Sequence, residues 1–267
     1  MDSISPKSRR WVCLRGLVRE SRHWGDFPAR LCAEVKGSLS SPLLLDLPGV
    51  GHEAGRRVPS TVSGFVDVLR PRLFPSRRPD TRDCLLAVSL GGMVALDWLA
   101  RFPDDFECAV VINTSTADLS SPFARFHPRH IPAILRAAWR GGIERERILL
   151  DITTNDPALD RDAVARRHAT YAEERPIGVG VFAAQLLAAS RCRTPRRVEV
   201  PLLVLASKAD RLVDVRCSMR LAEQLGCEIS LHESAGHDLP LDDPDWVIAA
   251  VRRFVSGAMM PAEQRGS

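Results

Sequence analysis

The sequence predicts an α/β fold, with a doubly wound and mostly parallel sheet of about six strands flanked by helices. Three observations support this prediction. Short β-prone runs bounded by turn residues recur along the 267-residue chain. The first five runs are apolar almost throughout, which is typical of strands buried on both faces of a parallel sheet. Helical stretches separate the runs, and alternation of strand and helix is the pattern of a doubly wound sheet.

The strands are predicted from short apolar runs, and the helices between them from longer stretches with helical periodicity. The predicted strands are Trp11–Leu14, Leu43–Asp46, Cys84–Val88, Cys108–Ile112, Leu202–Ala206 and Cys227–His232. Helices are expected over Thr61–Leu73, Met93–Arg101, Val215–Leu225 and Asp243–Val255. The last of these has acidic capping residues at its start and Pro244 in its first turn, which marks a helix N-terminus.

One long interval, from about Ala117 to Arg197, contains no strand pattern. Four helical pieces are expected there, over His130–Arg140, Ile143–Thr153, Arg161–Glu174 and Gly178–Arg191. The interval is too long for a plain connection, so it predicts a four-helix cap inserted after the fourth strand. The predicted organisation is a core formed by residues 1–116 and 198–257, a cap over 117–197, and a flexible tail over 258–267.

The cap carries many large apolar side chains, and we expect most of them to pack against the sheet and a minority to shape a ligand pocket. They are Phe123, Phe126, Ile131, Ile134, Leu135, Trp139, Phe182, Leu186 and Leu187.

Composition excludes several classes of protein. The net charge is only +4, and no basic run is interleaved with aromatic residues, so the sequence predicts no nucleic-acid partner. No stretch approaches the roughly 18 apolar residues of a membrane-spanning helix, so no membrane partner is predicted either. The seven cysteines form no C-x-x-C pair, and several lie in apolar runs. With no apolar stretch in the first ten residues, these features predict a reduced, cytoplasmic protein.

The end of the third predicted strand carries the first candidate catalytic residue. Residues 87–91 read A-V-S-L-G, which places Ser89 between small residues at a strand-to-helix turn. Small residues on either side allow a tight turn that projects the hydroxyl above the sheet, in the manner of a nucleophile elbow. The backbone N–H of Leu90 then points into the same site. Alone the pattern is weak, because a small-x-Ser-x-Gly sequence often occurs in an ordinary turn.

Two residues further along the chain strengthen the interpretation. A serine nucleophile needs a base, and the base needs an orienting carboxylate. Asp210 follows the fifth predicted strand and His237 follows the sixth, and Ser…Asp…His is the order of one known catalytic triad. Asp214 and Asp118 are the alternative acids. Ligands bind at the carboxyl ends of strands in doubly wound sheets, where all three triad candidates are expected.

From about Trp11 to Val255 the chain resembles the α/β-hydrolase fold superfamily. Residues 46–51 read D-L-P-G-V-G and resemble a loop of that family, residues 209–213 resemble its acid loop, and residues 235–237 with 242–244 resemble its histidine segment. The cap falls where many members carry one. Among subgroups, the chain is most similar to small serine carboxylesterases with a helical cap, nearest in style to pimeloyl-carrier-protein methyl esterases.

The resemblance implies a second backbone donor. The family usually has His-Gly after the first strand and takes an oxyanion N–H from the next residue, which corresponds to Leu17. Here Arg15 stands in place of that histidine and can brace the loop through its forked donors. Arg15 is also expected to place a cation near the pocket rim, and Trp24, eight residues after Gly16, matches an aromatic position of this loop. Arg15 and Trp24 are therefore the predicted substrate-binding residues.

The remaining histidines show no metal-ligand spacing, so neither a metal nor another cofactor is predicted. His23 and His52 lie on strand-end loops and can line the pocket, whereas His127, His130 and His168 are expected on the surface or in the cap. Among the carboxylates, Asp238 is expected to be a loop or surface group, and Asp46 to stabilise its own turn.

The resemblance implies a serine hydrolase that cleaves a small-molecule carboxylic ester or acyl thioester through an acyl-enzyme. A cofactor-free haloperoxidase or an acyltransferase would use the same triad. A non-catalytic binding protein with this fold is the alternative from a different class, and Arg15 is the feature that favours it. Dehalogenases are excluded because they need a carboxylate where Ser89 stands. No oligomeric state is predicted.

Overall fold

In the computed structural model, which describes residues 8–258, six parallel strands form one sheet in the order β2-β1-β3-β4-β5-β6. The strands are β1 (Ser8–Leu14), β2 (Leu43–Leu45), β3 (Thr81–Val88), β4 (Cys108–Ile112), β5 (Leu202–Ser207) and β6 (Glu228–His232). The predicted α/β class and six-stranded parallel sheet are therefore confirmed. In this order β3 and β4 lie at the centre of the sheet, and β3 directly precedes Ser89.

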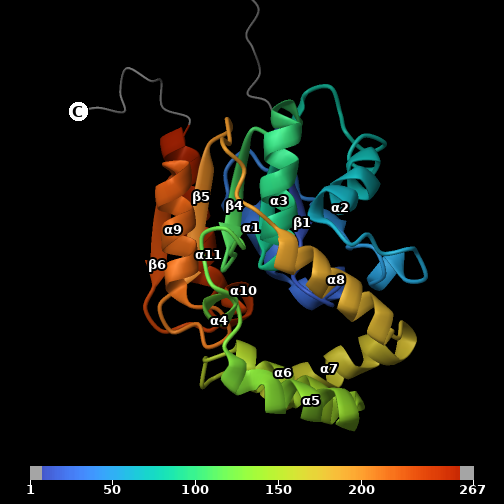
Figure 1. The fold of residues 1–267 in the computed structure, drawn as a ribbon. Helices are drawn as coiled ribbons and strands as arrows, with labels where there is room; N and C mark the ends of the chain where they lie inside the picture. The colour runs from blue at the N-terminus through green and yellow to red at the C-terminus, as the bar shows by residue number, and fades with distance from the viewer. Residues whose placement is uncertain (1–7, 259–267) are drawn as a thin grey trace, which may run out of the picture.

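Helices cover both faces of the sheet (Figure 1). One face packs against α2 (Val62–Leu69), α3 (Leu90–Arg101) and α9 (Val215–Leu225). The other packs against α1 (Phe27–Glu34) and α11 (Pro244–Ala258). Alternate strand residues enter the two layers, so both faces must be apolar. Cys13, Cys84 and Cys108 belong to the second layer, and burial raises the pKa of the Cys13 thiol, consistent with its role as a small apolar side chain.

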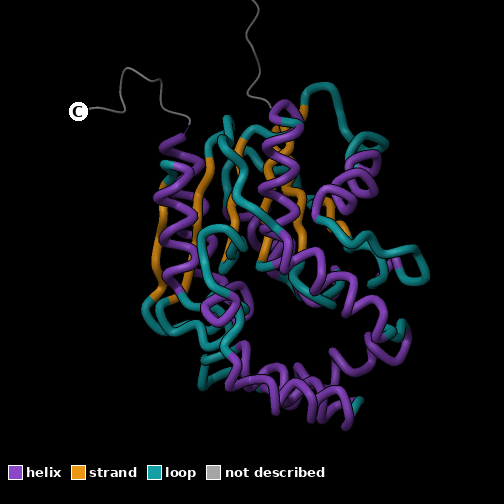
Figure 2. The backbone as a smooth tube through the Cα atoms, viewed as in Figure 1, coloured by secondary structure: helices purple, strands orange, loops and turns teal. Residues whose placement is uncertain are grey.

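In the described structure, five α-helices and no strand lie between β4 and β5, whereas the sequence predicts four helices there. They are α4 (Pro122–Arg125), α5 (Ile131–Arg140), α6 (Gly142–Thr153), α7 (Arg161–Glu174) and α8 (Val179–Arg191). Figure 1 and Figure 2 show α5, α6 and α7 gathered beyond the end of the sheet where the strands finish, with α8 returning toward the core. This arrangement places the helical segment over the strand-end loops.

Helices α1 and α4 were not predicted, and the elements that were predicted differ from the observed ones mainly at their ends. Strand β3 begins three residues earlier than expected, and α3 begins at Leu90 instead of Met93, directly after Ser89. Short 3-10 segments are η1 (Ser21–Trp24), η2 (Gly51–Glu53), η3 (Arg70–Arg72), η4 (Pro103–Asp105) and η5 (Pro128–His130). A four-residue helix, α10 (Leu239–Asp242), precedes α11, which extends to Ala258, the first residue of the predicted tail. The rest of that tail lies outside the described residues.

Candidate functional site

Ser89 lies at a sharp turn between β3 and α3. Its backbone has φ 54° and ψ −116°, a left-handed conformation that non-glycine residues rarely adopt. The turn packs closely against the backbone at the end of β1, because a Cβ on Gly91 would lie 2.6 Å from the carbonyl oxygen of Arg15. The Ser89 N–H donates to the Ile112 carbonyl at 2.8 Å, and the Thr114 hydroxyl donates to the Ser89 carbonyl at 2.8 Å. The surroundings therefore hold the strained turn that a nucleophile elbow requires.

His237 and Asp210 are in direct contact. The His237 Nδ1 lies 2.7 Å from Asp210 Oδ2, and both side chains are buried. The other carboxylate oxygen of Asp210 accepts from the N–H groups of Leu212 and Val213 at 2.8 and 3.0 Å. Because Asp210 is fixed by its own loop, it can hold the imidazole with Nδ1 protonated and leave Nε2 as the free acceptor.

The alternative acids have other partners. Asp214 is the N-cap of α9 and pairs with Arg216, and this contact lowers its pKa. Asp118 accepts from the backbone N–H and the hydroxyl of Thr194. Within residues 8–258, Asp210 is the carboxylate that contacts His237 by a hydrogen bond.

The loop that carries His237 and the turn that carries Ser89 are both attached to the end of β4. The Asn113 side-chain amide donates to the His237 carbonyl at 2.8 Å, and its oxygen accepts from the Ser207 N–H at 3.0 Å. The neighbouring Ile112 carbonyl binds the Ser89 backbone. No hydrogen bond joins Ser89 Oγ to His237 in the described part of the chain. Catalytic hydrogen bonds are commonly loose before substrate binds, so this geometry leaves the pair open as a proton-transfer couple.

The two predicted oxyanion donors belong to segments next to Ser89. Gly16 packs against it, since a Cβ at Gly16 would lie 3.2 Å from Ser89 Cβ and 3.7 Å from Ser89 Oγ. Leu17 follows Gly16, and Leu90 opens α3. Neither the Leu17 N–H nor the Leu90 N–H has a hydrogen-bond acceptor among the described residues. Two unpaired donors beside a strained serine are what an oxyanion hole requires.

A residue that the sequence analysis missed holds this loop from the cap. Gln185 on α8 is fully buried, and its side-chain oxygen accepts from the Val18 N–H at 2.8 Å. Val18 has φ 50°, so the loop after Leu17 is strained and needs such support. The Gln185 amide also donates to the Pro48 carbonyl at 3.4 Å. A buried glutamine in an apolar helix is the signal that could have identified it, because buried amides need partners.

Arg15 is the first residue of the oxyanion loop, which we define as residues 15–19, and it is buried, whereas the sequence analysis expected it at the pocket rim. It is 4% exposed, and its guanidinium makes a bidentate contact with Asp238 at 3.1 and 2.6 Å. The guanidinium also lies 4.7 Å from the centre of the Trp24 ring. Asp238 lies on a loop, as one of its two expected places, but it is buried and is not a surface carboxylate. Arg15 supplies the neutralising charge that lets an aspartate remain inside, and it lowers the pKa of Asp238 against the effect of burial.

Charges around His237 determine its proton affinity. Burial alone would lower its pKa, but Asp210 through charge and a hydrogen bond, and then Asp238, outweigh burial. Arg15 acts in the opposite direction. The net effect raises the pKa of His237 above the ordinary value of 6.5. A raised pKa makes the neutral imidazole a stronger proton acceptor.

A second buried polar cluster joins the cap to the core. His23 on η1 and His168 on α7 lie with ring centres 4.4 Å apart, beside Glu146 of α6. Their ligand atoms lie within 4.8 Å of one another, a geometry that can hold a metal ion. Glu146 is already paired with Arg19 at 2.6 Å and Arg145 at 3.0 Å, so both carboxylate oxygens face cations. Two guanidinium groups disfavour a dication, and the cluster is better explained as an ionic contact between cap and core.

This cluster gives the first testable prediction. Burial above all, and then the charge of Arg19, lowers the pKa of His168 to about 3, and burial also lowers the pKa of His23. The unfolded chain takes up these protons near pH 6.5, whereas the folded protein does not. The free energy of unfolding should therefore fall as pH drops from about 6.5 toward 3, by up to about 1.4 kcal/mol per pH unit for each histidine.

Urea unfolding at pH 7, 6, 5 and 4 measures this slope, and His168→Met should flatten it. His127→Gln is the matched control, because the His127 imidazole makes no hydrogen bond or ion pair within the described residues. An unchanged slope in His168→Met would contradict the assignment of the low-pH destabilisation to this cluster.

His52 and Asp46 are also in contact. Asp46 is buried and accepts from the His52 N–H at 2.8 Å, from the His52 ring at 3.0 Å, and from the Ser21 backbone. This agrees with the expectation that Asp46 stabilises its own turn. The His52 side chain is 68% exposed and lies on the loop surface.

The expectation that the apolar cap residues are buried is wrong for several of them. The exposed ones are Phe123, Ile131, Leu135, Trp139, Leu186 and Leu187. The buried face of α5 is formed by smaller groups such as Ala137, which packs against Ile148 and Ile152 of α6. The error arose because apolar spacing identifies a helix face without showing which face has a neighbour.

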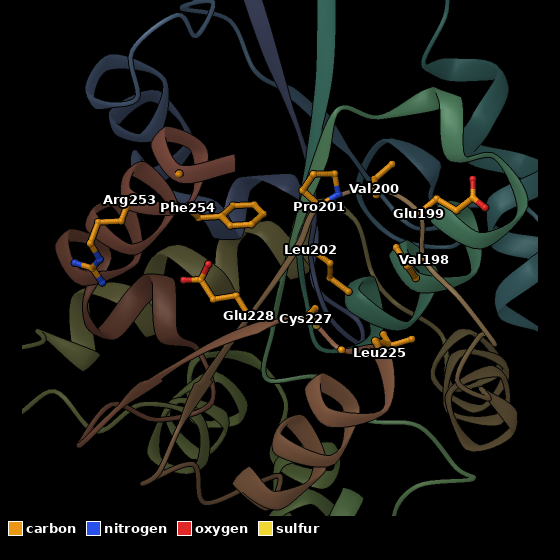
Figure 3. Close-up of a pocket in the computed structure, with 12 residues that line it drawn as sticks. Val198, Glu199, Val200, Pro201, Leu202, Leu225, Cys227, Glu228, Arg253 and Phe254 are labelled. Carbon is orange, nitrogen blue, oxygen red and sulfur yellow. The ribbon is translucent and has the colours of Figure 1, made fainter. Parts of the chain in front are cut away.

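A surface hollow of about 430 Å³ lies at the other end of the sheet (Figure 3). Its lining residues lie where strands begin. They include Pro201, which precedes β5, Leu202 at the start of β5, Glu228 at the start of β6 and Phe254 of α11. The triad candidates follow the carboxyl ends of the strands, so this hollow is separate from the candidate catalytic site. No helix in residues 8–258 is both long and apolar enough to cross a bilayer.

Comparison with known proteins agrees with this architecture. The sequence model of the Alpha/beta hydrolase family matches residues 11–250, and the chain belongs to that family. None of the curated proteins compared with the chain matches it in sequence.

Solved structures share the fold at low sequence identity. BpoC of Mycobacterium tuberculosis, provisionally named a non-heme bromoperoxidase, is 17% identical with a TM-score of 0.74, over 96% of this chain and 95% of that one. The esterase RhEst1 from Rhodococcus sp. ECU1013 is 21% identical with a TM-score of 0.67, over 94% and 92%. The carboxylesterase CesB from Bacillus subtilis is 20% identical with a TM-score of 0.66, over 95% and 85%. The chain is thus a hydrolase-family protein with esterase-like structural neighbours.

Proposed function

We propose that the protein is a serine hydrolase that cleaves a carboxylic ester or acyl thioester, with Ser89, His237 and Asp210 as its catalytic triad. The observation that carries the proposal is the buried 2.7 Å contact between His237 and Asp210, on a loop tied to the strand end next to the Ser89 turn. Packing alone does not require a buried histidine, an acid and a strained serine to follow strands at the same end of the sheet.

The chemistry follows from the position of each group. The Ser89 oxygen attacks the substrate carbonyl carbon while His237 Nε2 takes the hydroxyl proton, and the carbonyl electron pair moves to the oxygen. That oxyanion accepts hydrogen bonds from the Leu17 and Leu90 N–H groups. The C–O or C–S bond then breaks, and His237 returns the proton to the leaving alcohol or thiol. Water activated by His237 hydrolyses the acyl-serine, which restores the enzyme and releases the acid.

A fluorophosphonate probe tests the nucleophile without knowledge of the substrate. We expect the folded protein to be labelled at Ser89, as located by peptide mass spectrometry, because the probe reports a serine activated by a neighbouring base. His237→Gln should slow labelling strongly while the protein remains folded. An unlabelled Ser89 in folded wild-type protein would favour a non-catalytic binding protein. Wild-type turnover of p-nitrophenyl esters and acyl thioesters then distinguishes the two substrate classes.

A second candidate is suggested by the structural similarity to BpoC. The same acyl-enzyme attacked by hydrogen peroxide in place of water yields a peracid, and an alcohol acceptor yields a new ester. Product analysis with water, methanol and peroxide as competing acceptors separates hydrolase, acyltransferase and peroxidase-type activity. We favour water as the acceptor, since the structural neighbours include named esterases.

A further inference from the structure

We propose that Arg15 and Asp238 form a positioning pair that locks the oxyanion loop to the loop carrying the catalytic histidine. The inference rests on the proposed function, since it assigns these two side chains a role in the same reaction. Arg15 directly precedes Gly16 and Leu17 in the oxyanion loop, and Asp238 directly follows His237. The pair thus connects two loops that are 223 residues apart in the chain.

The geometry of the contact supports positioning rather than simple charge neutralisation. Two parallel contacts, from Nη1 to Oδ1 and from Nη2 to Oδ2, fix the orientation of both planar groups. Trp24 adds a third restraint, because its ring lies against the guanidinium at 4.7 Å. Both charged side chains are buried, so neither can reorient without leaving an unpaired charge inside the protein. A small movement of either loop would therefore break a strong contact.

Breaking the contact would displace two groups of the reacting centre, the Leu17 amide and the His237 imidazole. Gly16 packs directly against Ser89, so a shift of Arg15 moves the Leu17 amide relative to the nucleophile. A shift of Asp238 moves His237 relative to the same hydroxyl. Misplacement by about 1 Å can cost about 10²-fold in rate, even when every reacting group is present. We therefore expect the contact to affect kcat more than substrate binding.

The pair also places opposite charges next to His237. Arg19, His23 and His168 are the other charged or titratable groups near the pair, and Asp210 contacts the opposite side of the imidazole. Removing one member leaves the other unbalanced: the anion of Asp238 would raise the pKa of His237, and the cation of Arg15 would lower it. This sign difference separates the pair from a purely structural contact.

The test uses Arg15→Met, Asp238→Asn, the double variant and Arg15→Lys. We expect kcat to fall about 10- to 100-fold in every variant, with KM changed less. The lower pKa seen in the pH profile of kcat/KM should move up by about one pH unit in Arg15→Met and down by a similar amount in Asp238→Asn. It should return close to the wild-type value in the double variant. Arg15→Lys keeps the charge without the planar fork, so it should lower kcat and leave that pKa near its original value.

A matched control is available near the start of β1, the strand that precedes Arg15. Arg10 and Asp83 form another buried bidentate pair, at 2.7 and 3.0 Å, near the start of β1 and β3. Arg10→Met should lower the melting temperature without changing kcat or the pH profile of the folded enzyme. If an Arg15 or Asp238 single variant fails to fold, Arg15→Lys and the charge-neutral double variant still test the proposal.

The proton affinity of His237 is also measured without turnover, from the NMR titration of its imidazole, identified by the signal lost in His237→Gln. The pKa of His237 could shift in opposite directions in the two single variants while the wild-type protein shows no hydrolase activity. That result would support the pair and overturn the proposed function. An active enzyme whose pair variants keep the wild-type kcat and the wild-type titration would overturn the pair and leave the proposed function standing.

Discussion

Ser89→Ala is expected to lower kcat for ester hydrolysis by up to about 10⁶-fold, with little change in the fold. The Ser89 hydroxyl supplies the oxygen that forms the acyl-enzyme, whereas the nearby Thr114 hydroxyl is already engaged with the Ser89 carbonyl. Alanine keeps the backbone in the same left-handed conformation, so the turn and the two oxyanion amides stay in place. Substrate binding should survive. The measurement is single-turnover hydrolysis, together with a binding titration of the intact substrate.

Ser63→Ala is the matched control for this variant. The Ser63 hydroxyl of α2 donates to Asp97 of α3 at 2.9 Å. We expect its kcat to equal that of the wild type. Full activity in Ser89→Ala would show that another group is the nucleophile, and loss of activity in both variants would point to a folding defect.

The strands and most helices could be predicted because local signals coincide with the fold. Strand β4 and helix α9 were predicted with the observed bounds, since a buried apolar run and a Gly-ended amphipathic helix are local patterns. The candidate triad was also visible, because strand-end residues of a parallel sheet meet at one edge. Ends such as the start of α3 were missed, since the residue after a nucleophile elbow has no distinct helical signal.

The contacts that join distant segments could not be predicted. Arg15 appeared as a departure from the family pattern, but its partner Asp238 lies 223 residues away and has no local signature. Gln185 reaches the oxyanion loop from a helix whose position depends on the whole cap. The orientation of α5, which leaves Trp139 77% exposed, likewise depends on which neighbouring helix packs against it. Such features depend on tertiary packing, which a periodic pattern specifies only in part.

The second large effect is expected for Asp210→Asn, which should lower kcat by about 10⁴-fold. In the wild type, Asp210 Oδ1 accepts from the Leu212 and Val213 N–H groups, and Oδ2 faces His237. Asparagine can keep its oxygen on the two backbone donors, so the loop retains its shape. Its NH₂ group then faces Nδ1 of His237 and acts as a donor there. The imidazole must accept at Nδ1 and carry its proton on Nε2, where it cannot take the Ser89 proton.

This arrangement also predicts the direction of the pH effect. The carboxylate of Asp210 raises the pKa of His237 through its charge and hydrogen bond, so its loss lets burial lower that pKa. Residual activity of Asp210→Asn should therefore extend to lower pH than wild-type activity.

Asp214→Asn is the comparison variant, because Asp214 caps α9 and binds Arg216 without contacting His237. Because asparagine caps a helix about as well as aspartate, this variant should cost little stability and leave kcat unchanged. If Asp214→Asn lost most of its kcat while Asp210→Asn kept the wild-type kcat, Asp214 and not Asp210 would be the residue that orients His237.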